Sequence, residues 1–149
     1  MRSPGVSGVR LAAGEVRLPV CEWDRRSATI GRMSRRILIV DDHAGFRASA
    51  RRMLEAGGFE VAGEAENVAA ARVAVGELTP DAVLLDVQLP DGDGIALATE
   101  LTANGSAPLI VLCSSRGADE LGPRLDQSGA RGFVTKDKLS AAAIRELLA

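Results

Sequence analysis

The sequence predicts an α/β fold, in which a doubly wound parallel sheet of five strands has helices on both faces. Short continuous apolar runs, such as residues 37–40 and 109–113, are typical of parallel strands that are buried on both sides. Segments with apolar residues at helical spacing separate these runs, so that strand and helix alternate between residues 35 and 149. A chain of 149 residues is long enough for one domain with a sizeable core and too short for two full domains.

The first strand–helix pair begins with residues 37–40, and the acidic pair Asp41 and Asp42 opens the helix. Gly57 and Gly58 close this helix, because glycine readily adopts the backbone conformation that ends one. The residues at helical spacing, which predict a side that faces the core, are Phe46, Ala50, Met53 and Leu54.

The second pair and the third strand repeat this pattern. Alternating apolar residues over 59–63 predict the second strand, and Asn67 is expected to cap the helix after it. The apolar residues at helical spacing in that helix are Val68, Ala71, Val75 and Leu78. The third strand covers residues 82–85 and ends at Asp86.

The remaining elements complete the alternation. They are a loop over residues 88–94, a helix through 95–101, a strand over 109–113, a strand over 132–134 and a last helix that begins at Ser140. The segment between the fourth and fifth strands contains Gly117 and the pair Gly122 and Pro123. Because proline disfavours helical backbone at the residue before it, the fourth helix is expected to be short.

The first 34 residues differ from the rest of the chain in charge and pattern. They carry six arginines and three acidic residues, a net charge of +3, whereas residues 35–149 carry a net charge of −5. They are also interrupted by glycine and proline and show no sustained period. We predict a flexible N-terminal extension over residues 1–34 and a domain over residues 35–149. Translation starts at Met33, or residues 1–32 are a native arm, and both alternatives stay open.

Composition excludes several classes of function. The net charge of −2, the aromatic content of 3% and the absence of tyrosine argue against a nucleic-acid-binding surface. Cys21, Cys113 and the single His43 lack the spacing of a zinc site, and so few cysteines favour a reduced cytoplasmic setting. No apolar run approaches the roughly 20 residues of a membrane span.

Five polar residues lie where predicted strands end. Asp41 and Asp42 follow the first strand, Asp86 ends the third, Ser114 follows the fourth and Lys136 follows the fifth. In a doubly wound sheet, ligands bind outside the carboxyl ends of the strands. Each residue also has an ordinary explanation, because an aspartate in this position often caps a helix, a serine often lies in a solvated turn and a lysine is often a surface charge.

Together, these side chains have the chemistry of a phosphoryl-transfer site. Two carboxylates about 4 Å apart repel each other by roughly 4 kcal/mol at a surface-like dielectric, so a cluster of them calls for a cation. Ligation by oxygen alone favours Mg²⁺ or Mn²⁺ over zinc. A lysine adds a point charge suited to phosphate, and the set points to phosphoryl transfer onto a carboxylate.

The segment from residue 37 to residue 149 resembles the receiver domain of bacterial two-component response regulators. The residues that carry the resemblance are Val40-Asp41-Asp42, the run from Leu84 to Pro90 with Asp93-Gly94, Ser114-Ser115, and Gly129-Ala130 through Phe133 to Lys136. The pair Asp42-His43 and the run from Ser114 to Arg116 are most similar to actinobacterial members of the LuxR/NarL-type group. The resemblance implies a (βα)5 domain of flavodoxin-like strand order 2-1-3-4-5, and because the sequence ends after the fifth helix we expect it to stand alone.

The resemblance also implies a role for each matching position. Asp86 is expected to be the phosphoacceptor for a histidine kinase or a phosphotransfer protein. Mg²⁺ is expected to bind Asp42, Asp86 and the backbone carbonyl of Gln88, with Asp41 joining through water. Lys136 is expected to pair with Asp86 and then with the phosphate.

Two further residues are implied to act as a switch. Ser114 is expected to donate to a phosphoryl oxygen and to move on activation, and Phe133 to turn with it, although plain core packing would also explain Phe133. The chain departs from the family after Lys136, where Asp137 replaces the usual proline and puts a cis bond in doubt. Cys113 is expected to be a small buried hydrophobic residue, since strand alternation turns it to the side opposite Ser114.

Three other functions compete with this interpretation. A haloacid-dehalogenase-type phosphatase requires a second aspartate where Gln88 stands. A receiver-like interaction module that is never phosphorylated, and a truncated piece of a DNA-binding regulator, remain alternatives. The main interpretation is a phosphoacceptor that is not a turnover enzyme, binds neither nucleic acid nor membrane, and acts on an unknown downstream protein or through a phosphorylation-dependent dimer.

Overall fold

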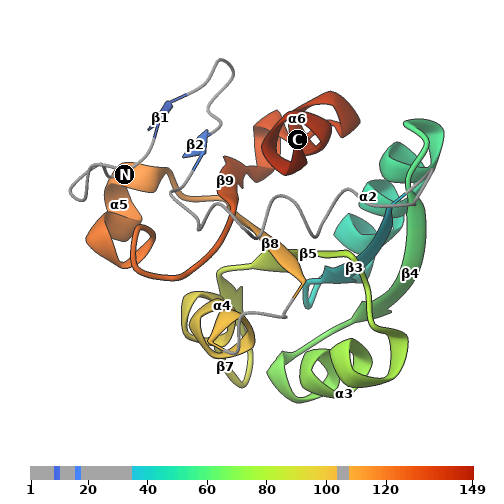
Figure 1. Cartoon of the computed structure of the whole chain (residues 1–149), viewed down its shortest axis with the longest axis horizontal. Helices are drawn as coiled ribbons and strands as arrows, with labels where there is room; N and C mark the ends of the chain where they lie inside the picture. The colour runs from blue at the N-terminus through green and yellow to red at the C-terminus, as the bar shows by residue number, and fades with distance from the viewer. Residues whose placement is uncertain (1–8, 11–15, 18–34, 104–107) are drawn as a thin grey trace.

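The computed structural model describes residues 9–10, 16–17, 35–103 and 108–149. Five strands of the main sheet run parallel (Figure 1): β3 (Arg36–Val40), β4 (Glu60–Ala65), β5 (Ala82–Asp86), β8 (Leu109–Ser114) and β9 (Gly132–Thr135). Their spatial order is β4-β3-β5-β8-β9, which confirms the predicted parallel sheet and its order 2-1-3-4-5. The strand that ends at Asp86 therefore lies in the middle, with a neighbour on each side.

The sheet has a separate hydrophobic layer on each face, because successive side chains of a strand point to opposite sides. Leu38 and Val40 of β3 face α3 (Val68–Leu78) and α4 (Gly94–Thr102). Ile37 and Ile39 face α2 (Ala44–Ala56) and α6 (Ala141–Leu148). β5 alternates in the same way and is buried along its whole length. Such burial explains why the strands read as continuous apolar runs.

The helix starts follow the predicted caps in two cases and differ in a third. Asn67 accepts a hydrogen bond from the backbone N–H of Ala70 at 2.7 Å, and Ser140 caps α6 in the same manner. The interpretation of Asp42 as a helix cap is wrong, because the cap position of α2 belongs to His43, whose side chain makes no capping hydrogen bond. The side chain of Asp42 therefore does not cap α2. No helix in the described part of the chain is long and apolar enough to cross a membrane.

The fourth helix is short, as predicted. It consists of α5 (Ala118–Leu121) followed by the 3-10 turn η2 (Gly122–Arg124). No residue of α5 is fully buried, although Ala118 and Leu121 pack partly against the core. A second 3-10 turn, η3 (Lys136–Lys138), follows β9, and the peptide bonds of the described residues are all trans.

Residues 88–94, predicted as a loop, form a small two-stranded ribbon. β6 (Gln88–Leu89) pairs with β7 (Gly92–Asp93), and two carboxylates of this segment hold neighbouring helices. Asp91 accepts hydrogen bonds from the backbone N–H groups of Val68 and Ala69, at 2.7 and 3.1 Å, and Asp93 caps α4. The ribbon after Asp86 is therefore attached to α3 and α4.

Two short strands of the N-terminal extension lie at the β9 edge of the sheet (Figure 1). β1 (Val9–Arg10) pairs with β2 (Val16–Arg17), which pairs antiparallel with β9 through Val16 opposite Phe133 and Arg17 opposite Gly132. The sequence predicted no regular element here, because two-residue strands leave no period to detect. The predicted flexibility of the other residues of 1–34, and Met33, lie outside the described residues.

Candidate functional site

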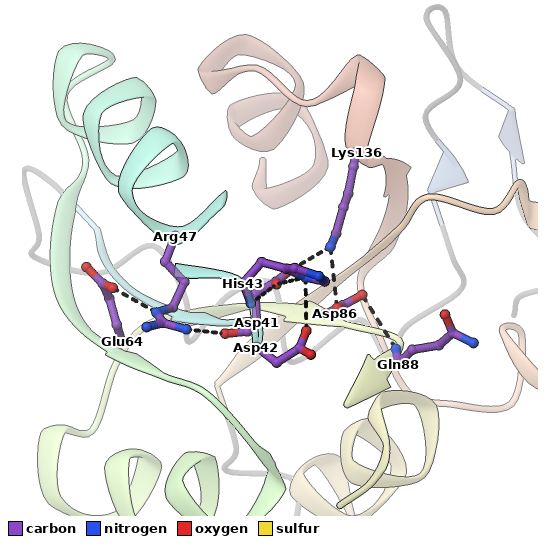
Figure 2. Close-up of polar contacts among 8 residues, drawn as sticks. All are labelled: Asp41, Asp42, His43, Arg47, Glu64, Asp86, Gln88 and Lys136. Carbon is purple, nitrogen blue, oxygen red and sulfur yellow. Dashed lines mark hydrogen bonds and ion pairs between the residues drawn. The ribbon is translucent and has the colours of Figure 1, made fainter. Parts of the chain in front are cut away.

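The carboxyl ends of β3, β5 and β9 bring three of the predicted side chains together at one edge of the sheet, although β8 lies between β5 and β9. Asp41 follows β3, Asp86 ends β5 and Lys136 follows β9, and Figure 2 shows the three converging. Asp41 is 0% exposed and Asp86 is 5% exposed, so both carboxylates are buried. Two buried carboxylates next to each other need a positive partner, which Lys136 supplies.

Lys136 is bound to both carboxylates but lies closer to Asp41. Its Nζ atom is 2.6 Å from Oδ2 of Asp41 and 3.4 Å from Oδ2 of Asp86 (Figure 2). Burial disfavours the ammonium, but the contact with Asp41 and the charges of both aspartates outweigh it, so the pKa of Lys136 is raised. The sequence predicted the pair with Asp86 and missed the shorter contact with Asp41.

The environment of Asp86 favours its protonated form more than water does. Burial, followed by the negative charge of Asp41, raises the pKa of Asp86 from 3.8 to about 6, although Lys136 and the backbone N–H of Gln88 act in the opposite direction. That N–H donates to Oδ1 of Asp86 at 3.5 Å. The carboxylate is thus ionised at neutral pH but poorly stabilised, and an added cation would find a favourable place beside it.

The loop between β3 and α2 gathers a second group of possible ligands. The backbone N–H of His43 donates to Oδ1 of Asp41 at 2.8 Å. The Nδ1 atom of His43 lies 3.3 Å from Oδ1 of Asp41 and 3.1 Å from Oδ1 of Asp42. One ligand atom from each of these three residues lies within 4.8 Å of the others. His43 was not among the predicted site residues.

The donor set fits a hard divalent cation. Asp41, Asp42 and Asp86 offer carboxylate oxygens, the ligands that Mg²⁺ prefers, and Asp42 is exposed enough to be reached from solvent. The structure brings Asp41 next to Asp42 on one side and Asp86, through Lys136, on the other. The predicted ligation by the Gln88 carbonyl stays a prediction, since the contact of Gln88 with Asp86 is through its N–H.

Arg47 attaches this loop to the neighbouring strand, and nothing in the sequence pattern indicated it. Its Nη1 donates to the backbone carbonyl of Asp41 at 2.6 Å, and its Nε donates to Glu64 of β4 at 3.0 Å (Figure 2). Arg51 donates to the other oxygen of Glu64 at 2.8 Å. The hydrogen bond from Arg51, and then that from Arg47, lower the pKa of Glu64. A fixed carboxylate therefore orients the arginine that holds Asp41.

The two predicted switch residues are both buried. Ser114 ends β8, is buried, and accepts a hydrogen bond from the backbone N–H of Arg116 at 3.0 Å. Phe133 points inward and is fully buried among the side chains that face α3 and α4. Movement of either residue stays a prediction.

Cys113 belongs to the opposite face of the sheet, as predicted from strand alternation. It packs with the residues that face α2 and α6 and is fully buried. Burial, and then the charge of Asp86, raise the pKa of its thiol. Such a thiol stays protonated and is not a nucleophile at neutral pH.

Comparison with known sequences identifies the family. Residues 37–148 match the response regulator receiver domain. The chain is 38% identical over 104 residues to the chemotaxis protein CheY of Bacillus subtilis, which covers 70% of this chain and 87% of that protein. It is also 38% identical over 103 residues to the transcriptional regulatory protein PdtaR of Mycobacterium tuberculosis, which covers 68% of this chain and 49% of that protein.

Solved structures give the same result. The receiver domain of the response regulator NarL from Mycobacterium tuberculosis has a TM-score of 0.71 and 30% identity, over 78% of this chain and 95% of that one. A LuxR-family two-component response regulator from Aurantimonas sp. SI85-9A1 has a TM-score of 0.70 and 30% identity, over 77% of this chain and 85% of that one. By sequence, by strand order and by the residues gathered at its sheet edge, the chain belongs to the response regulator receiver domains.

Proposed function

We propose that this chain is the phosphoacceptor of a two-component system. It takes a phosphoryl group from the phosphohistidine of a histidine kinase, or of a phosphotransfer protein, onto Asp86. The observation that carries the proposal is the carboxylate of Asp86, which ends the central strand next to Asp41 and Lys136 and has a pKa of about 6. This carboxylate is anionic at neutral pH and lies at the edge where ligands of such sheets bind.

The transfer is a nucleophilic substitution at phosphorus. An oxygen of Asp86 forms a bond to phosphorus while the phosphorus–nitrogen bond of the phosphohistidine breaks, and the imidazole leaves with that electron pair. The product is an acyl phosphate on Asp86, formed once per chain. The domain is a stoichiometric acceptor in this scheme and not a turnover enzyme.

Asp41, Asp42, Asp86 and the carbonyl of Gln88 would hold Mg²⁺, with Asp41 joining through water. Bound there, the ion would offset the charge of the carboxylates and of the incoming phosphoryl oxygens. Lys136 adds a further positive charge, since its ammonium already contacts both Asp41 and Asp86. A phosphoryl group on Asp86 offers that ammonium new acceptors within reach.

The output surface in this proposal is the face formed by α5, β9 and α6. Phe133 lies within β9, and Ser114 ends β8, which pairs with β9. The ribbon after Asp86 also reaches this face, because Asp93 forms an ion pair with Arg124 of η2. A downstream protein, or a second copy of the chain in a phosphorylation-dependent dimer, would bind there. A cytoplasmic location belongs to the same proposal.

Phosphorylation by a small donor tests the proposal directly. Incubation with acetyl phosphate and Mg²⁺ should add one phosphoryl group, detected by intact-protein mass spectrometry. Asp86→Asn should abolish the addition, Asp42→Ala or omission of Mg²⁺ should slow it by orders of magnitude, and Asp126→Asn should leave it unchanged. Labelling of Asp86→Asn at the normal rate contradicts the role of Asp86. A folded chain that is never labelled would instead be an interaction module.

A further inference from the structure

Phe46 adds an aromatic face to the surroundings of Lys136. The Nζ atom of Lys136 lies 4.6 Å from the centre of the Phe46 ring. In the sequence, Phe46 counts only as one residue of the apolar side of its helix. The structure keeps it half-buried against the core on the α2 side of the sheet, so one ring contacts both the core and the ammonium.

The ring and the carboxylates bind the ammonium in different ways. The face of an aromatic ring carries partial negative charge and attracts a cation within about 6 Å of its centre. A carboxylate binds through directed hydrogen bonds, whereas the ring attracts without a fixed acceptor. The ammonium has three N–H groups. It can therefore rotate or change hydrogen-bond partners over the ring without losing this attraction.

The helix that carries Phe46 is anchored to the sheet. Phe46 lies in the first turns of α2, and α2 is held to the sheet by the fully buried Ala50 and Leu54. Lys136 belongs to the 3-10 turn after β9, in which no residue is buried, and its side chain is 20% exposed. The ring thus belongs to a helix with buried residues that anchor it, whereas the lysine belongs to a turn that has none.

We propose that Phe46 is a positioning residue for Lys136, whose ring keeps the ammonium beside Asp86 while it exchanges a carboxylate for a phosphoryl oxygen. The inference rests on the proposed phosphoacceptor function and adds to it a residue that touches neither the metal nor the phosphoryl group. Leucine at this position would fill much of the same volume against the core, but it has no charged face. Tyrosine keeps both properties.

The first experiment measures the geometry and does not depend on phosphorylation. Protons above an aromatic ring are shifted upfield in NMR spectra, so the ε-methylene protons of Lys136 should be shifted upfield in the unmodified chain. The shift should persist in Phe46→Tyr and disappear in Phe46→Leu. Lys136→Arg, which removes the signal, assigns it. An unshifted signal in the unmodified chain, or a shift that survives in Phe46→Leu, would overturn the proposal.

The second experiment measures the rate of phosphorylation from acetyl phosphate with saturating Mg²⁺. Phe46→Leu should slow it by about three- to tenfold, the factor that corresponds to a typical cation–π contact, and Phe46→Tyr should restore most of the rate. Phe59→Leu is the matched control, because Phe59 is also half-buried against the same core layer and lies 5.7 Å from a cation, Arg145. It should keep the normal rate.

Equal slowing by Phe46→Leu and Phe59→Leu would mean that only core packing matters, and equal slowing by Phe46→Leu and Phe46→Tyr would mean that the ring has no electrostatic role. Either result overturns the proposal. If the unmodified chain is not phosphorylated at all, the proposed function fails, while the NMR signal of Lys136 still shows whether the ring holds the lysine.

Discussion

The backbone of Gly94 lies directly against the backbone carbonyl of Asp86, with no space between them for a β-carbon. The N–H of Gly94 donates to the carbonyl of Val87 at 2.7 Å, which fixes the start of α4 at the end of β5. The residue that carries the proposed phosphoacceptor carboxylate therefore packs against the first turn of a helix.

This contact predicts that Gly94→Ala lowers both the stability of the chain and its rate of phosphorylation. A β-carbon would overlap the carbonyl oxygen of Asp86, so the strand end or the helix must move. We expect a loss of about 1–3 kcal/mol in the free energy of unfolding, measured with urea, and a slower phosphorylation. Gly76→Ala is the control, because a β-carbon there meets nothing within 4 Å. A variant Gly94→Ala with normal stability and rate would contradict this close approach.

A second prediction concerns pH and the charge of Asp86. The pKa of Asp86 rises on folding from 3.8 to about 6. The folded state therefore binds the proton of Asp86 more tightly than the unfolded state does. The free energy of unfolding is highest at low pH in this respect, and it falls as pH rises through about 6 and Asp86 ionises. Asparagine does not ionise, so Asp86→Asn should not show this fall. Without divalent cations, it should raise the free energy of unfolding by about 1–2 kcal/mol at pH 8.

The same measurement at low pH supplies the control. Well below the folded pKa, Asp86 is already protonated, so the unmodified chain and Asp86→Asn should have similar free energies of unfolding at pH 4. A stabilisation of equal size at both pH values would show that removal of the charge is not its cause. Added Mg²⁺ should stabilise the unmodified chain and not the variant.

A third prediction concerns the arginine that holds the acidic loop. Arg47→Ala removes the donor to the Asp41 carbonyl, and we expect about tenfold weaker binding of Mg²⁺ by titration calorimetry. Arg47→Lys should also bind Mg²⁺ more weakly. Its single ammonium replaces the two separate donors with which Arg47 binds the Asp41 carbonyl and Glu64. The control Arg72→Ala breaks an exposed ion pair with Glu100 and should leave Mg²⁺ affinity unchanged. Equal affinities in all variants would restrict Arg47 to a structural role.

A fourth prediction concerns the spread of the signal. Ser114→Ala should accept the phosphoryl group but lose most of the response at the α5–β9–α6 face, because in the proposed function the hydroxyl of Ser114 donates to the new phosphoryl oxygen. Backbone NMR shifts on phosphorylation should cover residues 114–136 in the unmodified chain and stay near Asp86 in the variant. Shifts confined to the Asp86 pocket in both proteins would exclude this face as the output.

A fifth prediction concerns the N-terminal extension. Among the described residues, β2 pairs with β9 at two positions, so removal of residues 1–32 should lower the free energy of unfolding by less than about 1 kcal/mol. Amide hydrogen exchange at Gly132 and Phe133, which face β2, should become faster. A large fall in melting temperature would show that the extension packs on the domain through far more than these two pairs.

The features that periodicity and capping rules predicted correctly are local ones, whereas the strand order and the pair of Lys136 with Asp86 were predicted from the resemblance to the receiver family. Strands appear as apolar runs, the caps Asn67 and Ser140 stand next to their helices, and proline after Gly122 shortens the fourth helix. The strand-end position of Asp86 follows from the same patterns. Each of these features depends on residues a few positions apart, within the reach of a periodicity or a capping rule.

The features that it missed depend on contacts between distant segments. Nothing in the sequence pattern shows that Arg47 donates to Glu64. Nor does it show that the ring of Phe46, in α2, contacts the ammonium of Lys136, which follows β9. Asp42 fits a helix cap by position, yet the turn after β3 gives the cap position to His43. Such contacts are set by how elements pack against each other, which one sequence does not record.

The exposed character of α5 has a consequence for how such a domain changes over evolutionary time. Asp119 and Glu120 are exposed, and no residue of α5 is fully buried. Substitutions at such positions usually alter stability by no more than about 0.5 kcal/mol, whereas those on buried strands cost much more. A duplicated copy of this chain could therefore acquire a new binding specificity through α5 while β5 and its carboxylate stay intact. Insulation between parallel signalling routes can thus arise without loss of the fold.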